Sequence, residues 1–479
     1  MFQRSTARPH GRAVVVLTGS TLNSRPVLGD DPHRLNASRV SGGESPVEAT
    51  HVAHLLRRTE YVVRPERLAA LSQPSVTREN AVDDILAVTV PVALPAFLDH
   101  DIDGQGYDQW VYAVQWWIDR MVDAPRPMLE KMTWFWHGHF CSSWDKVNSA
   151  KAMLAQNKLF RDSAFGNFRT LTQTMAVQPA MLFYLDNVDN VKRSPNQNFA
   201  RELMELFTLG VGNYTEDDVT AAARAWTGHG IDWDTLEYRF WPSQHDIGTK
   251  TFMGVTRNWN GPDIINYLLQ ENTTKKLVAC RFLTKKLWEF FAHQQPAQTI
   301  IDELAQVLFD SDLAILPWVK AMLMRDEFYS VAAQQGMVRS PVDFVVAVQY
   351  HTGLRAADLD PQWYVENMGQ VPFDPPNVAG WKTNGYWVNT SLFGARADFA
   401  RGVTWHLRHD DANSIGDGHT PAETVDIAAA MFGLNLSDAT RTALVHFVDV
   451  QRANEPWVGW WEATNLLTMT MMTPEFHVA

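Results

Sequence analysis

Helical spacing of hydrophobic and polar residues is clearest at residues 198–209 of this 479-residue chain. Successive residues of an α-helix are rotated by about 100°, so residues three and four apart share a side. The apolar side of this stretch holds Phe199, Leu203, Leu206 and Phe207. The opposite quadrant holds Asn198, Arg201, Glu202 and Glu205. The pattern predicts a helix whose apolar side is anchored in a core and whose polar side meets either water or a site.

The residues that follow predict where this helix ends and where the next one begins. Gly210 suits the left-handed backbone conformation that commonly ends a helix. Thr215 can cap a second helix through its hydroxyl, with Asp218 completing a Thr-x-x-Asp pattern similar to a capping box. We expect this second helix to run to about Trp226.

Helical spacing recurs along most of the remaining chain, and strand patterns are scarce. The segments 227–261 and 368–390 are irregular, and the first contains strand-like residues at 237–241. We predict a mainly α fold, a large multi-helix globular unit with long irregular loops and at most a small β-hairpin. The further helices are predicted at 51–58, 65–89, 108–121, 128–136, 147–159, 164–177, 179–186, 262–270, 273–292, 297–310, 315–324 and 341–353, with three or four more near the C-terminus.

The first part of the chain differs from the rest in composition. Residues 1–46 show no periodicity and are rich in Ser, Arg, Pro, Gly and Asn, which is typical of chain that cannot bury a core. We predict a disordered leader at 1–46 and an all-α domain at 47–479. This domain is either one large unit or two packed helical subdomains that divide near 227–261.

The leader also bears on localisation. Arg4, Arg8 and Arg12 precede the short apolar run 13–17, an arrangement similar to a signal peptide. A run of five apolar residues is too short for the hydrophobic region of such a peptide. We therefore expect a cytoplasmic protein, with export as the alternative. We expect no transmembrane segment, because no apolar run approaches the roughly 20 residues that a membrane-spanning helix needs.

Composition and missing motifs exclude several classes of protein. The formal net charge is −13 and no run of Lys or Arg forms a basic stripe, so nucleic acid is not an expected partner. The two cysteines, Cys141 and Cys280, are too few for a disulfide framework or a cysteine-only zinc site, and we expect buried thiols. The sequence lacks the nucleophile elbow of serine hydrolases, the phosphate-binding P-loop, the dinucleotide-binding glycine motif and the His-Glu-x-x-His motif of zinc proteases.

Several segments together resemble a bacterial family of unknown function known as DUF1800. They are 54–58 (His-Leu-Leu-Arg-Arg), 134–140 (Trp-Phe-Trp-His-Gly-His-Phe), 167–169 (Asn-Phe-Arg), 196–216, 245–254 and 375–381 (Pro-Pro-Asn-Val-Ala-Gly-Trp). The resemblance extends over roughly 47–476 and implies no activity, although members of the family often appear exported. The chain departs from the family pattern at 59–62, where a glycine-containing turn is usual, and at His229, where tryptophan is usual.

A pair of carboxylates is the first candidate site. Glu202 and Glu205, three residues apart, are neighbours on a helix surface, and such a pair suits general acid–base catalysis or metal binding. Arg201 and Asn198 on the same face would bind substrate. The alternative is a solvated face on which Arg201 pairs with Glu205 four residues away.

Two histidines form a second candidate. His137 would be a catalytic residue, and His137 and His139 together with Glu202 could hold a divalent metal ion. On a continuous helix the two rings point about 200° apart, so chelation requires Gly138 to break the helix. The alternative is a hydrogen-bonded core histidine among aromatic residues.

The two irregular segments supply further candidates. In 227–261, Asp246 could orient His245 or take up a proton, and Lys250 could bind an anionic group. In 368–390, Asn377 and Trp381 could line a surface on which sugar rings stack, with Tyr386 and Trp387 beside them. The alternatives are a turn with a solvated charge pair and a loop pinned to the core.

Two functions follow as hypotheses. The first is an enzyme, a hydrolase or lyase acting on a polar or anionic polymer such as a glycan, with its cleft floored by the helix at 198–209. The second is a non-catalytic binding or scaffold protein in which the same polar residues form a buried structural network.

Overall fold

The computed structural model describes residues 47–88, 93–95, 106–334, 336–407, 414–454 and 459–478. The predicted leader at 1–46 lies outside the described residues. The possible division of the domain near 227–261 stays a prediction.

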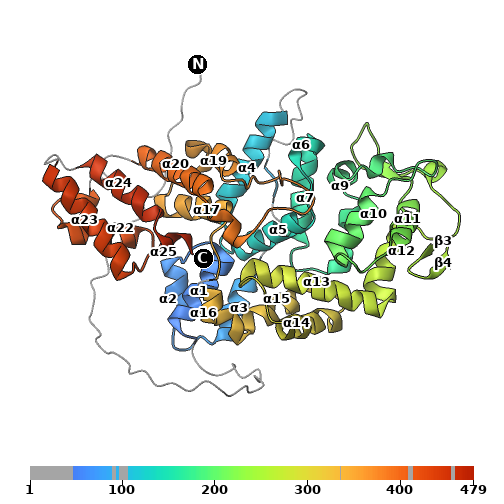
Figure 1. Ribbon diagram of the computed structural model, residues 1–479, viewed down its shortest axis with the longest axis horizontal. Coiled ribbons are helices and arrows are strands. Elements are labelled where there is room, and N and C mark those ends of the chain that lie inside the picture. The colour runs from blue at the N-terminus through green and yellow to red at the C-terminus, as the bar shows by residue number, and fades with distance from the viewer. Residues whose placement is uncertain are drawn as a thin grey trace. The chain divides into compact units, whose positions relative to one another are not determined.

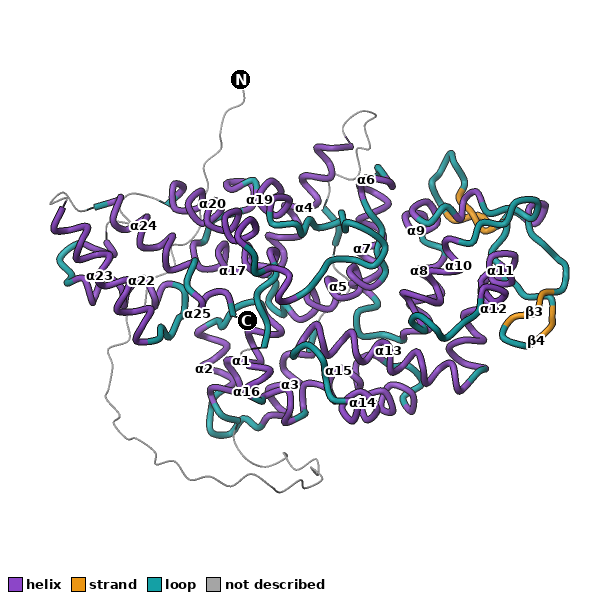
Figure 2. Tube along the Cα trace, viewed as in Figure 1, coloured by secondary structure: helices purple, strands orange, loops and turns teal. Residues whose placement is uncertain are grey.

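Helices make up most of the described structure, which confirms the predicted mainly α fold (Figures 1 and 2). The helices of the first half are α1 (Ala49–Glu60), α2 (Pro65–Leu71), α3 (Arg78–Leu86), α4 (Gly106–Asp123), α5 (Met128–His139), α6 (Trp144–Val147), α7 (Ala150–Asp162), α8 (Phe168–Ala176), α9 (Pro179–Tyr184), α10 (Asn198–Glu202) and α11 (Glu216–Ala225). Those of the second half are α12 (Gly261–Asn266), α13 (Thr273–Phe291), α14 (Gln298–Asp310), α15 (Ile315–Met324), α16 (Val331–Gln334), α17 (Pro341–Thr352), α18 (Ala356–Leu359), α19 (Pro361–Asn367), α20 (Thr390–His406), α22 (Pro421–Met431), α23 (Asp438–Asn454), α24 (Trp460–Met471) and α25 (Pro474–His477).

The predicted end of the helix at 198–209, called the central helix below, and the predicted start of the next helix are both confirmed. Thr215 caps α11 through a full capping box with Asp218, which satisfies backbone N–H groups that have no partner inside the helix. Gly210 has a φ of 80° and ends the preceding helix in the left-handed region. These ends are local features, so the sequence alone predicts them.

The strands form two small antiparallel hairpins inside the irregular segment 227–261 (Figure 2). In the first hairpin, β1 (His229–Ile231) pairs with β2 (Tyr238–Phe240), which lies in the strand-like stretch predicted at 237–241. In the second, β3 (Lys250–Phe252) pairs with β4 (Val255–Arg257) and lies beside α11 (Figure 1). Its two-residue turn has positive φ at both central positions, as the tight turns preferred in hairpins require.

The central helix differs from the prediction of a regular α-helix. Only α10 is regular, and Leu203–Thr208 continue it as a π-helix. In a π-helix each N–H reaches the carbonyl five residues earlier, as in the 2.8 Å bond from the Leu209 N–H to the Met204 carbonyl. The wider turn rotates the later residues away from the positions that a period of 3.6 assigns to them.

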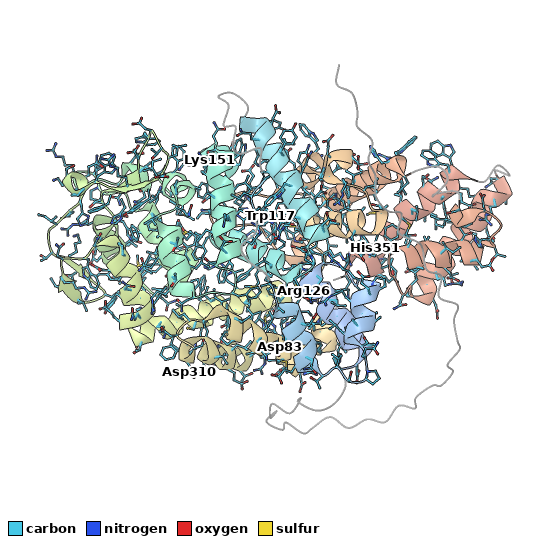
Figure 3. The ribbon with its side chains drawn as sticks, turned by 180° about the vertical axis from the view of Figure 1, so that it is seen from behind. Asp83, Trp117, Arg126, Lys151, Asp310 and His351 are labelled. Atoms are coloured by element: carbon cyan, nitrogen blue, oxygen red, sulfur yellow. The ribbon has the colours of Figure 1, made fainter. Side chains whose placement is uncertain are left out.

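The helix α5 lies between two hydrophobic cores. One cluster of buried residues includes Phe135 and Trp136 of α5, and the other includes Trp134 of the same helix. Every residue of α5 except Gly138 is buried, as expected of a helix with packing partners on all sides. Trp117, labelled in Figure 3, packs against Trp134 from α4.

A buried ion cluster joins α5 to α4 and α7. Both oxygens of Glu130 accept hydrogen bonds from Arg161 at 2.8 and 2.9 Å, and Arg120 and the Trp117 indole donate to them at 2.6 and 2.9 Å. The Glu130 and Arg161 side chains have no exposed area. Burial alone would raise the pKa of Glu130, but the two arginines hold this pKa below its ordinary value.

We expect Glu130→Gln to destabilise the protein by about 3–5 kcal/mol, because it leaves the buried Arg161 without its counter-charge. Urea unfolding followed by circular dichroism measures the change. The control is Asp162→Asn, which breaks the exposed Lys158–Asp162 pair and should cost less than about 1 kcal/mol. Equal effects of the two substitutions would contradict this account of the Glu130 cluster.

Candidate functional site

The C-terminal end of the central helix meets α5 and α13. The Nε2 atom of His139 donates to the Phe207 carbonyl at 3.0 Å. Lys286 on α13 donates to Nδ1 of His139 at 3.2 Å and to the Leu206 carbonyl at 3.4 Å. The last carbonyls of a helix have no partner within the helix, so these two side chains cap it. A cation is also favoured at this negative end of the helix dipole.

These contacts define the protonation state of His139. Because a carbonyl only accepts, Nε2 carries the proton and Nδ1 is left to accept from the Lys286 ammonium. Burial, together with the positive charge of Lys286, holds the pKa of His139 well below its ordinary value. His139 is therefore a neutral ring with a defined tautomer, and it positions Lys286.

A cavity of about 230 Å³ opens at this junction. Trp134 and Trp381 stack face to face in its wall, with ring centroids 4.9 Å apart. The residues that line the cavity are Trp134, Phe135, Gly138, His139, Lys286, Glu289, Phe290, Gln370, Ala379, Trp381, Lys382 and Thr383. The pocket is thus mainly aromatic, with a few polar groups, as ligand pockets usually are.

Lys286 is the unusual residue of this pocket. It forms no ion pair with any carboxylate of the described ranges, and burial lowers its pKa to about 8. Lys286 is not among the site residues that the sequence predicts. The available signal is that Lys286 shares a side of α13 with Phe282, Leu283 and Phe290, a position at which a lysine is partly buried.

His137 lies on the opposite side of α5 from His139. Its Nε2 atom accepts a hydrogen bond from the Phe373 N–H at 3.1 Å, and burial lowers its pKa to about 3. The helix continues through Gly138 to His139, so the break that chelation requires does not occur. No group of three or more His, Cys, Asp or Glu side chains in the described part of the chain could hold a metal ion. The structure therefore does not bring His137, His139 and Glu202 together as a metal site.

Most side chains on the predicted polar face of the central helix form hydrogen bonds with neighbouring residues. Arg201 forms two hydrogen bonds of 2.8 Å with Glu216 of α11, in place of the pairing with Glu205 that the solvated-face alternative expected. Glu205 accepts from the Tyr214 hydroxyl, and Asn198 donates to Asp186 at 3.0 Å.

Glu202 is the member of this face whose carboxylate is unengaged. It is half-buried, and no residue of the described ranges donates a hydrogen bond to it. Burial, followed by repulsion from Glu205, raises the pKa of Glu202. A carboxyl group with a raised pKa suits a general acid, but Glu202 does not line the Lys286 pocket.

The predicted residues of segment 227–261 hold that segment together. Asp246 accepts from Arg224 at 2.7 Å. Lys250 is buried and donates to the Asp246 carbonyl, to the Asn258 side chain at 3.2 Å and to the Trp259 carbonyl at 2.9 Å. All three ammonium hydrogens of Lys250 are therefore used within the segment, and burial lowers its pKa.

In segment 368–390, only Trp381 of the predicted stacking residues reaches the pocket. Asn377 is exposed and accepts from the Ala379 N–H at 2.9 Å, which fixes a turn. Trp387 is buried, whereas Tyr386 is exposed. Gly380 has a φ of 81°, and a Cβ atom there would lie 2.7 Å from the Gly138 carbonyl. Glycine at this position therefore lets the loop close over the end of α5.

The fold and the pocket define a mainly α protein with a half-buried lysine in an aromatic pocket. The described helices include none long and apolar enough to cross a bilayer. The sequence model of the family described as "Protein of unknown function (DUF1800)" matches residues 54–478. The chain therefore belongs to the DUF1800 family, which confirms the resemblance. It matches no curated protein and no solved structure.

We expect Lys286→Met to raise the stability of the protein at neutral pH. The pKa of Lys286 is about 8 in the folded chain and about 10.4 in the unfolded chain. Below the lower value both states are protonated, and the folded state bears the whole cost of burying the charge. Between the two values the unfolded chain binds more protons, so the stability of the unaltered protein rises with pH.

The gain should be about 1–2 kcal/mol at pH 7, after the loss of the hydrogen bonds to His139 and Leu206. It should shrink as the pH approaches 10. Urea unfolding at pH 7 and pH 9.5 measures it, with the exposed Lys285→Met as the matched control. A loss of stability that does not depend on pH would contradict the lowered pKa of Lys286.

Proposed function

We propose that this protein is an enzyme of the lyase class whose reactive group is the Lys286 amine. The observation that supports this most directly is a half-buried lysine without a carboxylate partner among the described residues, with a pKa of about 8, in the wall of a pocket. A lysine near this value supplies roughly a fifth of its population as neutral amine at about pH 7.4. Neutral amines are nucleophiles and bases, whereas ammonium groups are neither.

The contacts around Lys286 suit this role. His139 and the Leu206 carbonyl hold the Nζ atom in place, and neither is a carboxylate that would form an ion pair with the ammonium. Lysines desolvated in a hydrophobic pocket are a recurrent route to Schiff-base chemistry. The nucleophile is thus positioned and partly deprotonated before a substrate arrives.

The reaction begins with attack of the Lys286 nitrogen on a substrate carbonyl carbon. The resulting carbinolamine loses its oxygen as water and leaves a protonated Schiff base. That cation accepts the electron pair of the C–C bond at the neighbouring carbon and becomes an enamine. The departing carbon, which carries a hydroxyl, leaves as a carbonyl compound and releases the hydroxyl proton. Protonation of the enamine and addition of water then release the product and restore the lysine.

The pocket also indicates the size of the substrate. Its 230 Å³ accommodates a small carbonyl compound or the terminal unit of a longer molecule. The stacked Trp134 and Trp381 would contact an apolar or ring-shaped part, while Gln370 and Thr383 offer polar contacts. A polar polymer such as a glycan would therefore reach Lys286 only through its end.

Reductive trapping tests this proposal. The protein is incubated with propanal or benzaldehyde and sodium cyanoborohydride, and the modified lysines are identified by peptide mass spectrometry. We expect Lys286 to be modified faster than Lys285 at pH 7.5, with a pH midpoint near 8, whereas exposed lysines follow a value of about 10.4.

Lys286→Met should lose the adduct, and Lys285→Met should keep it. If Lys286 reacts no faster than Lys285, or if its midpoint equals that of exposed lysines, the proposal is overturned. The non-catalytic alternative, in which the polar residues serve only as a structural network, would then be favoured.

A second candidate function is a hydrolase of a polar polymer with Glu202 as general acid, supported by its raised pKa and unengaged carboxylate. We expect Glu202→Gln to fold normally and to change stability by less than about 0.5 kcal/mol, because no hydrogen bond is lost. It should abolish release of reducing ends from a panel of soluble polysaccharides. Asp217→Asn, at an exposed carboxylate of α11, is the control. Full activity of Glu202→Gln would exclude this role.

A further inference from the structure

A second cavity, of about 490 Å³, shares no residue with the Lys286 pocket. It is lined by Arg57 of α1, by Arg339 just before α17 and by His351 of α17, which is labelled in Figure 3. Phe432 and Glu475 also contribute to its wall. Arg57 belongs to the His-Leu-Leu-Arg-Arg segment at 54–58, to which the sequence assigned no role.

Cations outnumber carboxylates around this cavity. Arg58 and Arg339 are each 5% exposed, and Arg396 is fully buried. Among the described residues, the carboxylate that acts on all three is Asp343. Asp343 is already engaged in a 2.6 Å ion pair with Lys131. None of the arginines at 57, 58, 339 and 396 forms a salt bridge within the described ranges.

Two of these arginines form hydrogen bonds with other acceptors, although the Nε atom of each is buried without a partner. Arg58 donates to the Ala292 and Ala333 carbonyls. Arg396 donates to Nδ1 of His477 at 2.9 Å and to the Arg339 carbonyl at 2.8 Å. Backbone carbonyls and the His477 ring therefore hold these guanidinium groups in place, although they do not neutralise them.

The guanidinium groups of the two arginines that line the cavity form no hydrogen bond with any residue of the described chain. The Nε and Nη1 atoms of Arg339 are buried and have no hydrogen-bond partner, and its guanidinium lies over the Phe476 ring at 4.7 Å. The half-buried Arg57 makes no hydrogen bond or ion pair with any residue of the described chain. An unpaired charge removed from water is costly, so donors of this kind call for a partner from outside the chain.

We propose that this cavity binds a small organic anion through the guanidinium groups of Arg57 and Arg339. The planar fork of a guanidinium matches the oxygens of a carboxylate or a phosphate group. The cavity is larger than an inorganic ion needs, and the Phe432 and Leu434 side chains in its wall suit the organic part of such a ligand.

Glu475 narrows the class of ligand. Its Oε1 atom accepts from the Ser437 N–H at 3.0 Å and from the Thr440 hydroxyl at 2.9 Å. Its Oε2 atom is buried without a donor, although Glu475 lines the cavity. A hydroxyl or ammonium group on the same ligand would donate to this oxygen, so the cavity favours an anion that carries a second, donating group.

Thermal unfolding of the full chain tests the proposal. Sodium phosphate, acetate and lactate are compared with sodium chloride at equal ionic strength. We expect a saturable rise in Tm of about 2–4 °C with the oxyanions, largest for lactate because its hydroxyl can reach Glu475. An equal rise in Tm with acetate and with lactate would show that Glu475 does not contact the ligand.

Substitutions locate the effect. Arg57→Gln and Arg339→Gln should each abolish the rise and weaken binding at least ten-fold by calorimetry, while Arg401→Gln, at an exposed arginine, should leave both unchanged. Without an anion, Arg339→Gln should not lower Tm, because it removes an unpaired buried charge. If the Arg339→Gln variant fails to fold, Arg57→Gln, at a half-buried residue, still tests the proposal. A rise that chloride reproduces, or that both variants retain, would overturn the proposal.

Discussion

The last carbonyl groups of the central helix are the constraint on which the middle of the structure depends. A helix that ends inside a protein must find donors for these groups, and here the donors come from other helices: His139 of α5 to Phe207, and Lys286 of α13 to Leu206. These bonds join three helices and hold a lysine where burial lowers its pKa to about 8. The same contacts that complete the fold therefore position the candidate reactive group.

Charged side chains that are removed from water fall into two groups in this protein: those with a full set of partners stabilise the fold, and those without are candidate site residues. Glu130 is matched by two arginines and an indole, and Lys250 by three acceptors, so both serve the fold. The half-buried Lys286 forms no ion pair among the described residues, and the buried Arg339 has guanidinium nitrogens without a partner. Groups that the fold leaves uncompensated are where function is most often found, and both of these line cavities.

Local features were predicted well, and features that depend on distant partners were not. The cap at Thr215 and the helix end at Gly210 need only neighbouring residues, and both are confirmed. The π-helix at 203–208 was missed, because helical periodicity does not reveal a change in the hydrogen-bonding pattern. Lys286 was missed as well, because a lysine in an amphipathic helix looks like a solvated residue until the loop that covers it is known.

By itself the sequence determined the helical class, most helix positions, the cap at Thr215 and the helix end at Gly210. These features depend on helical spacing and on caps, and both involve residues that are close together in the chain. Only the tertiary structure decided that His137 and His139 face opposite sides and that Arg201 pairs with Glu216. It also decided which charges are left without partners. The physical reason is that burial and pairing depend on residues far apart in sequence, and these set the pKa values and the cavities on which chemistry depends.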